Sequence, residues 1–227
     1  MRQTGHGVQK WTNLTNKHVG AVVDRWQAEG LAVGTIKEYL SGVRTVLRHF
    51  DNDRIAADNR AFNLANRVYV SNQDKSLPQA AYEKAVSALQ SSNSINDNRI
   101  AAQLMLQRTL GLRKEESFKF SPARSVLADG RIYITDGTKG GRDRILHQIS
   151  DPARVAIAYA KTVLSGANTM ANTMTERQWN ALFYRTIKAQ GITKQQCGAS
   201  AHGLRHAYAR ERYRALTGFA ARSRRYR

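Results

Sequence analysis

Apolar residues recur at three- and four-residue spacing in two segments near the N-terminus, which is the spacing of one face of an α-helix. In residues 15–29 these positions are Val19, Val22, Val23 and Trp26. In residues 35–50 they are Ile36, Tyr39, Leu40, Val43, Val46, Leu47 and Phe50. Gly30 and Gly34 lie between the two segments. The pattern predicts two amphipathic helices joined by a turn.

A domain boundary is predicted shortly after this helical pair. Residues 56–68 are consistent with a third, shorter helix, and the polar stretch SNQDKSLPQ that follows contains Pro78, one of only three prolines. We therefore expect a helical domain over residues 1–73 and a larger domain over residues 79–227.

The larger domain combines helical periodicity with one stretch of alternating residues. Helices are predicted at residues 79–89, 96–110, 152–164, 175–189 and 202–216. Between them, residues 125–150 alternate apolar and polar positions around an Asp129-Gly130 turn and a Gly140-Gly141 turn, which predicts three short antiparallel strands. The expected fold class is α+β and mainly helical, with Trp26, Phe50 and Trp179 in the core.

Charge narrows the class of binding partner. The 227 residues include 36 Lys+Arg and 17 Asp+Glu, so the formal net charge is 36 − 17 = +19. A polyanion is the natural partner of such a chain, with nucleic acid first and an anionic membrane surface second. The sequence shows no apolar run of about 18 residues and no signal-peptide pattern, which weakens the membrane alternative.

Cys197 is the only cysteine, which excludes an internal disulfide and a zinc site built on paired cysteines. A lone cysteine in a predicted loop is a poor nucleophile candidate. A reducing cytoplasm fits this cysteine content, and with the nucleic-acid partner expected from the charge we expect a cytoplasmic, nucleoid-associated protein. The sequence has no carboxylate cluster resembling a two-metal nuclease site and no P-loop, so we expect neither a metal ion nor a small-molecule cofactor.

The stretch HGLRH, residues 202–206, offers the first candidate chemistry. At about 100° per residue, His202 and Arg205 lie on the same side of the first turn of the predicted helix. A guanidinium beside an imidazole near a helix N-terminus matches one phosphate group. The alternative is a solvated surface arginine and a capping or core histidine.

Two other segments carry residues of the same kind. In TLGLRKEES, Arg113 is followed three residues later by Glu116, close enough to orient it through one carboxylate pairing. In TKGGRDR, Lys139 stands at the tip of a predicted hairpin, where its ammonium can reach into a groove.

The segments GLRKEE, TKGGRDR and HGLRH, in this order after a helical N-terminal domain, resemble the tyrosine recombinases, the phage-integrase family. The resemblance covers residues 10–216. It implies an N-terminal helical core-binding (SAM-like) domain and a recombinase-type catalytic domain with a small three-stranded sheet, from a mobile element.

The resemblance also implies roles for individual residues. Arg113 and Arg205 would grip the non-bridging oxygens of the scissile phosphate, and preorganised cations there would stabilise the developing charge. Lys139 would protonate the leaving 5′ oxygen, and His202 would assist proton transfer. Glu116 and His206 would be supporting residues. Contacts with the DNA backbone are expected from Arg142, Arg144, Arg210 and Arg214.

The nucleophile of this family is a tyrosine well beyond the HxxR segment, and no matching element is visible in the sequence. Tyr208 matches a buried aromatic position. Tyr213 is eleven residues from His202, or roughly 16 Å along an unbroken helix, too far to share one phosphate. Tyr226 is the least excluded candidate. We therefore expect a catalytic domain that is truncated at its C-terminus.

Two functions follow as hypotheses. The first is a site-specific recombinase that cuts and rejoins duplex DNA through a 3′-phosphotyrosine, but is unable to complete cleavage as this chain stands. The second is a non-catalytic DNA-binding protein, or less favourably an RNA-binding one, whose basic residues serve only as phosphate contacts. Double-stranded DNA is the expected partner in the first case, with a homo-oligomer on DNA possible.

Overall fold

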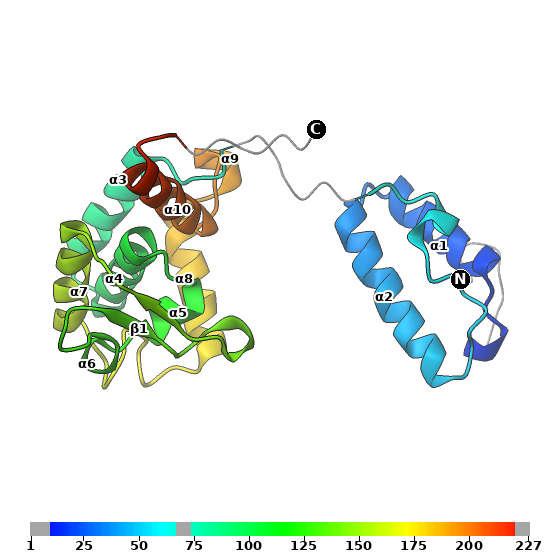
Figure 1. The fold of residues 1–227 in the computed structure, drawn as a ribbon, viewed down its shortest axis with the longest axis horizontal. Helices are drawn as coiled ribbons and strands as arrows, with labels where there is room; N and C mark the ends of the chain where they lie inside the picture. The colour runs from blue at the N-terminus through cyan, green and yellow to red at the C-terminus, as the bar shows by residue number, and fades with distance from the viewer. Residues whose placement is uncertain (1–9, 67–73, 221–227) are drawn as a thin grey trace. The chain divides into compact units, whose positions relative to one another are not determined.

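The computed structural model describes residues 10–66 and 74–220, and its internal contacts divide the chain into two units, Met1–Ser71 and Asn72–Arg227 (Figure 1). Each unit has an apolar core built from its own residues. The two units are therefore described separately.

The first unit is built on the helical pair α1 (Asn16–Ala28) and α2 (Val33–His49), flanked by the short 3₁₀ helices η2 (Trp11–Asn13) and η3 (Asn59–Phe62). A capping box between Thr15 and His18 starts α1. The apolar stripes of the two helices meet in the core predicted from the periodicity. Its buried members are Val19, Val23, Ile36, Leu40, Phe62 and Leu64.

Two sequence predictions for this unit are wrong. Residues 56–66 of the expected third helix form only the turn η3, because Asp58 accepts a hydrogen bond from the backbone of Arg60 and Asn63 ends the turn at φ +52°. Such side chains compete with helix formation. Phe50, expected in the core, caps the end of α2 and is 41% exposed, stacked on Trp11. Trp26 is half-buried.

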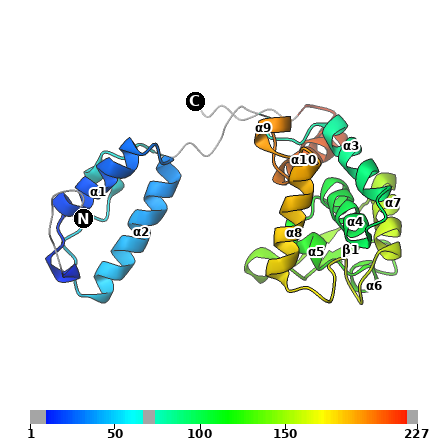
Figure 2. The ribbon, with the colours of Figure 1, turned by 180° about the vertical axis from the view of Figure 1, so that it is seen from behind.

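The second unit is a helical assembly around one central helix, α4 (Ile95–Leu110) (Figures 1 and 2). Nearly every residue of α4 from Ile100 onward is buried, which is the pattern of a helix covered on all sides. The longer helices around it are α3 (Gln79–Gln90), α7 (Asp151–Thr162), α8 (Glu176–Ala189) and α10 (His202–Thr217). Trp179 of α8 is fully buried, as predicted.

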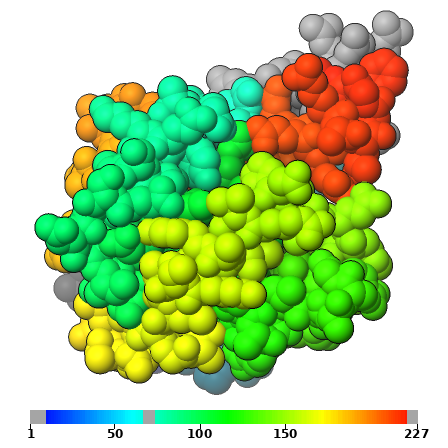
Figure 3. Space-filling model, turned by 90° about the vertical axis from the view of Figure 1, so that its left-hand side faces the viewer, coloured from blue at the N-terminus to red at the C-terminus, as the bar shows by residue number. Residues whose placement is uncertain are grey.

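Three short helices complete this unit and were not predicted from the sequence. They are α5 (Lys114–Phe118), α6 (Pro122–Ser125) and α9 (Lys194–Cys197). Each is five residues long or fewer, so periodicity carries little signal for them. Figure 3 shows the face of this unit formed largely by α3 and α7, with the end of α10 in red beside them.

The small sheet has two strands, β1 (Ile132–Ile134) and β2 (Arg144–Leu146), paired antiparallel with Ile132 opposite Leu146 and Ile134 opposite Arg144. The expected third strand is reduced to an isolated bridge between Val126 and Ile132, because α6 occupies the residues just before Val126. The predicted fold class, mainly helical with a small antiparallel sheet, is confirmed.

In the part of the chain that the structure describes, no helix has the length and apolar character needed to cross a membrane.

Candidate active site

The site starts where α4 ends. Gly111 terminates α4 in the left-handed conformation, with φ +62°, and the chain turns at once into α5. Glu116 at the third position of α5 accepts a hydrogen bond from the backbone N–H of Arg113, 2.6 Å from N to Oε2. This capping arrangement holds a fully buried carboxylate at a fixed place.

Three arginines from three distant parts of the chain gather around this carboxylate. Arg113 Nη1 donates to Glu116 Oε1 at 2.7 Å, and Arg144 Nη2 donates to Oε2. Arg205 Nη1 lies 4.0 Å from Oε2 and donates instead to the carbonyl of Gly111. Arg144 Nη2 also reaches that carbonyl, at 3.4 Å. We call Arg113, Arg144, Arg205 and Glu116 the arginine cluster.

The cluster carries an excess of positive charge. Three guanidinium groups and one carboxylate give a formal charge of 3 − 1 = +2. Burial lowers the pKa of Arg205, and the positive charges of Arg144 and Arg113 lower it further. The side chains of Arg113 and Arg205 are 41% and 29% exposed, so both can meet a ligand from solvent. The arrangement suits an anion.

Lys139 lies in the 3₁₀ turn η4 (Lys139–Gly141), between β1 and β2, as the sequence predicts for a hairpin tip. Its side chain is exposed and makes no hydrogen bond or ion pair with any described residue. The hairpin packs tightly against α5: at Gly137 the two backbones are so close that an added Cβ would lie 2.7 Å from the backbone of Glu115. The lysine is thus carried on a turn that abuts the cluster.

His202 is the first residue of α10 and is exposed. Arg205 follows three residues later, about one turn along the same helix. Its ring meets that of His206 edge-on, with the centroids 4.9 Å apart. Partial burial lowers the pKa of His202, as do the neighbouring His206, Arg205 and Arg113. His202 lies three residues before Arg205 on α10, so its imidazole lies near the cluster, whose positive charge disfavours the protonated ring.

The start of α10 is fixed by a glycine. Gly203 accepts a backbone hydrogen bond from Leu77 at 3.0 Å, and a Cβ there would lie 2.7 Å from the Leu77 nitrogen. Farther along α10, Arg210 pairs with Asp74 at 3.1 Å, while Arg214 is exposed. Arg142, on the hairpin, is also exposed. The expected DNA contacts of these arginines stay predictions.

Arg144, from which the sequence predicts a contact with the DNA backbone, is bonded inward to Glu116, and its side chain is 25% exposed. The predicted DNA contact stays a prediction. The strand register explains this orientation, because residues directly opposite each other in a sheet share a face. Arg144 stands opposite the buried Ile134 and therefore projects toward the interior. The sequence held a signal for this inward orientation, because residues two apart in a strand share a face and Leu146, an apolar residue, lies two positions after Arg144.

The three tyrosines weighed as possible nucleophiles have different surroundings. The half-buried ring of Tyr208 packs on Gly111, where an added Cβ would approach it to 2.2 Å, so the expected packing role fits. Tyr213 is 47% exposed on an α10 that continues unbroken to Thr217. Tyr226 lies outside the described residues.

Behind α5 lies a buried polar network that sequence reasoning missed. Gln103 of α4 donates to Thr169 at 3.1 Å and accepts from the Trp179 indole at 3.3 Å. Thr169 in turn donates to the carbonyl of Ser117, the residue after Glu116, at 2.6 Å. Buried polar groups satisfied in this way hold α5, and with it the carboxylate, in one position.

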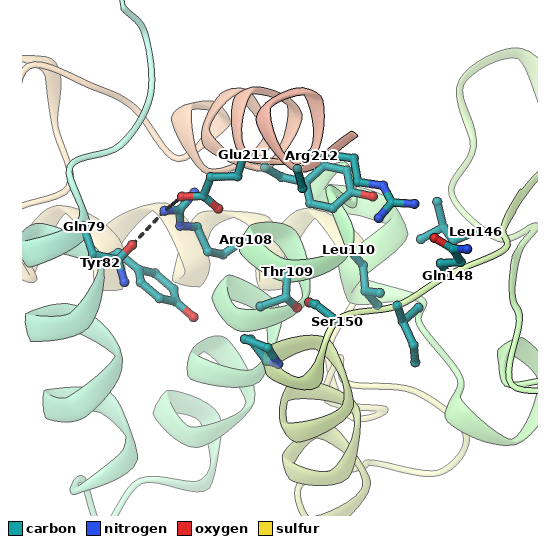
Figure 4. A pocket seen from close by; sticks show the side chains of 14 residues that line it. Gln79, Tyr82, Arg108, Thr109, Leu110, Leu146, Gln148, Ser150, Glu211 and Arg212 are labelled. Carbon is teal, nitrogen blue, oxygen red and sulfur yellow. Dashed lines mark hydrogen bonds and ion pairs between the residues drawn. The ribbon is translucent and has the colours of Figure 1, made fainter. Parts of the chain in front are cut away.

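A pocket of about 420 Å³ is lined by residues of α3, α4 and α10, including Tyr208, and by the segment from Leu146 to Pro152 (Figure 4). In Figure 4, Gln79 and Glu211 reach the buried guanidinium of Arg108 at one side of the pocket, and Arg212 extends at the other. Lys139, His202 and the cluster arginines do not line it. The arginine cluster, rather than this pocket, is the candidate active site.

Among the described residues, no three His, Cys, Asp or Glu side chains come together in the manner of a metal site. The expectation of chemistry without a metal or other cofactor stays a prediction.

Comparison with known proteins identifies the fold. The chain has a TM-score of 0.61 to lambda integrase in a dimer bound to a COC′ core site, with 18% identity over 95% of this chain and 76% of that one. It has a TM-score of 0.60 to the Tn1549 transposon integrase in complex with circular intermediate DNA, with 15% identity over 93% of this chain and 76% of that one. A lambda integrase tetramer bound to a Holliday junction gives 0.62, with 20% identity over 95% and 62% of the two chains.

No curated protein sequence matches the chain. Two family models do. One, described as "Phage integrase, N-terminal", matches residues 1–56. The other, described as "Integrase", matches residues 69–211, which is more than half of the chain and includes Arg113, Lys139 and Arg205. With the arginine cluster and the fold, these matches show that the chain belongs to the integrase family, that is, to the tyrosine recombinases.

Proposed function

We propose that this chain is a site-specific DNA recombinase of the tyrosine class that binds duplex DNA and grips one phosphate in the arginine cluster. The observation that carries the proposal is the convergence of Arg113 and Arg205 at Glu116, with partly exposed side chains and a net positive charge. A chain of net charge +19 attracts nucleic acid, and a DNA phosphodiester is then the anion that such a site would bind.

The residues have separate tasks in this proposal. Arg113 and Arg205 bind the non-bridging oxygens of the scissile phosphate, where charge grows in the transition state. Lys139 protonates the leaving 5′ oxygen from the hairpin. Because its pKa is lowered, His202 is neutral near pH 7 and can accept a proton from an attacking hydroxyl. Glu116 and His206 support these groups, and the attacking tyrosine leaves a 3′-phosphotyrosine in the cut strand.

The division of the chain fits a two-domain DNA-binding protein. We propose that the helical unit before residue 73 is the core-binding domain and that the unit from residue 79 is the catalytic domain. The related lambda and Tn1549 integrases were solved on DNA, one of them as a tetramer. Assembly of this chain as a homo-oligomer on duplex DNA is the corresponding proposal.

The test uses the full chain and a duplex selected by binding from a random pool. Single phosphates are replaced by neutral methylphosphonates, and the affinity of each duplex is measured for wild type, Arg113→Ala, Arg205→Ala and the control Arg142→Ala. We expect one phosphate whose neutralisation weakens wild type but no longer matters in Arg113→Ala and Arg205→Ala. Arg142→Ala should keep full sensitivity there and lower the salt slope by about one unit.

If Arg113 and Arg205 share no phosphate, the chain is a plain DNA-binding module and the recombinase site is refuted. A nicked version of the same duplex tests cleavage. We propose that the chain as it stands binds without completing cleavage. An SDS-resistant protein–DNA adduct that disappears in Tyr226→Phe would contradict this part and assign the nucleophile.

A further inference from the structure

Arg144 is the one arginine of the cluster that has no task at the scissile phosphate in the proposed function. It comes from β2, whereas Glu116 comes from α5 and Arg205 from α10. It is also the least exposed of the three arginines, at 25% against 29% for Arg205 and 41% for Arg113. Its Nε is buried and has no hydrogen-bond partner. A guanidinium in this position is poorly placed to contact DNA directly.

The hydrogen bonds of Glu116 show what Arg144 does. Oε1 accepts from Arg113 Nη1, and Oε2 accepts from the Arg113 backbone and from Arg144 Nη2. Both carboxylate oxygens are thus occupied without Arg205. The Nη1 of Arg205 is 4.0 Å from Oε2 and is bonded to the Gly111 carbonyl instead. Arg205 therefore lies near the carboxylate but makes no hydrogen bond with it.

The charge of Arg144 decides whether Arg205 pairs with Glu116. With Arg144 in place, Glu116 faces three guanidinium groups and cannot neutralise them all, so Arg205 keeps attraction for a further anion. Without Arg144, the buried carboxylate would lack one charged donor, and a buried anion strongly favours a replacement. Apart from Arg113 and Arg144, Arg205 is the one described residue that forms an ion pair with Glu116. It would close the 4.0 Å gap and turn toward Glu116.

We infer that Arg144 is a positioning residue that occupies Glu116 and so keeps the guanidinium of Arg205 available to the phosphate. The inference rests on the proposed function, because it takes Arg205 to face a phosphate. It also links the hairpin that carries Lys139 to the phosphate site through a single ion pair. Removing Arg144 therefore acts on anion binding through Arg205, and this effect depends on the charge of Glu116.

The experiment follows the Nε–Hε signal of Arg205 by NMR in the full chain with isotope-labelled arginine. Inorganic sulfate is the probe, because it is a tetrahedral anion whose charge is constant near pH 7. The variants are Arg144→Met, which keeps the apolar stem, Glu116→Gln, and the double variant. Arg144→Met should weaken sulfate binding at Arg205 by about tenfold, the equivalent of one charge-assisted hydrogen bond.

The double variant decides the mechanism. If Arg144 acts by occupying the carboxylate, neutralising Glu116 should restore the sulfate affinity of Arg144→Met to within about threefold of Glu116→Gln alone, a coupling typical of contacting residues. A double variant as weak as Arg144→Met would overturn the inference and make Arg144 a direct anion ligand. Equal sulfate affinities of Arg144→Met and wild type would also overturn the inference. So would an Arg205 Nε–Hε signal that does not shift when sulfate is added.

Arg144→Lys guards against a folding defect. It keeps a positive charge beside Glu116, so most of the sulfate affinity should remain if charge is what matters. A loss in Arg144→Lys equal to that in Arg144→Met would refute the charge-based account. DNA affinity is measured in parallel by gel shift. Failure of wild type to bind duplex DNA would refute the proposed function, whereas the sulfate titration would still decide the role of Arg144.

Discussion

At the scale of single residues, Gly111 links the packing of the second unit to its chemistry. Its positive φ ends α4, its carbonyl accepts hydrogen bonds from Arg144 and Arg205, and its missing side chain leaves room for the ring of Tyr208. A side chain here would violate two constraints at once. The residue must be glycine both for its backbone conformation and for the close approach of an aromatic ring.

We expect Gly111→Ala to lower the free energy of unfolding by about 3 kcal/mol, the sum of left-handed backbone strain and overpacking. Chemical denaturation of the full chain measures this value. Gly130→Ala is the control, since Gly130 also has a positive φ, +83°, but no atom within 4 Å of an added Cβ. It should cost only about 1 to 2 kcal/mol. Equal losses in the two variants would show that Tyr208 gives way.

At the scale of elements, the cluster is assembled by contacts between helices and the hairpin rather than by any one segment. The end of α4 supplies Gly111, α5 supplies Glu116, β2 supplies Arg144 and α10 supplies Arg205. The hairpin is held to α5 at Gly137, and α10 is held to the Leu77 segment at Gly203. Small residues at these two points permit the backbones to touch.

The contact at Gly203 gives a prediction with an unusual sign. Replacing glycine by alanine inside a helix usually stabilises a protein by about 0.5–1 kcal/mol. Gly42→Ala in α2, where an added Cβ meets nothing within 4 Å, should follow that rule. Gly203→Ala should instead be destabilising, because its Cβ would lie 2.7 Å from the backbone of Lys75 and Leu77.

Thermal unfolding of the two alanine variants and wild type measures both effects. A stabilised Gly203→Ala would mean that the Leu77 segment moves aside at little cost. A destabilised Gly203→Ala should also shift the NMR signal of Arg205, which lies two residues along α10.

At the scale of the whole molecule, the two units have separate apolar cores, one built on Val19, Ile36 and Leu40 and the other on α4. The net charge of +19 belongs to the chain as a whole and favours polyanions as partners. In the proposed function, this net charge draws the chain to DNA, and the arginine cluster selects one phosphate among many. These are different tasks, and only the second depends on atomic positions.

Separate cores predict separate unfolding events. Leu40 and Leu104 are both fully buried, one in each core. Leu40→Ala should lower one calorimetric transition and Leu104→Ala another, each by about 2–5 kcal/mol of unfolding free energy. Calorimetry of the full chain and the two variants provides the measurement. If both substitutions shift the same single transition equally, the two units unfold as one.

The amino-acid order alone predicts the longer helices, the turn glycines and the candidate residues Arg113, Glu116, Lys139, His202 and Arg205. These depend on local properties, namely periodicity, turn chemistry and short motifs, which are readable from neighbouring residues. It did not reveal the short helices around the site, the exposure of Phe50, or the absence of a third helix where Asp58 and Asn63 favour a turn.

The way in which those residues meet depends on how the chain folds. That Glu116 is shared by three arginines, that Arg144 turns inward, and that Arg205 is bonded to Gly111 all depend on segments far apart in the chain. The energy of a buried charge depends on distances of a few ångströms to groups whose position the motif does not specify. The sequence therefore named the charged groups, and packing around α4 decided which of them pair with Glu116 and which with the Gly111 carbonyl.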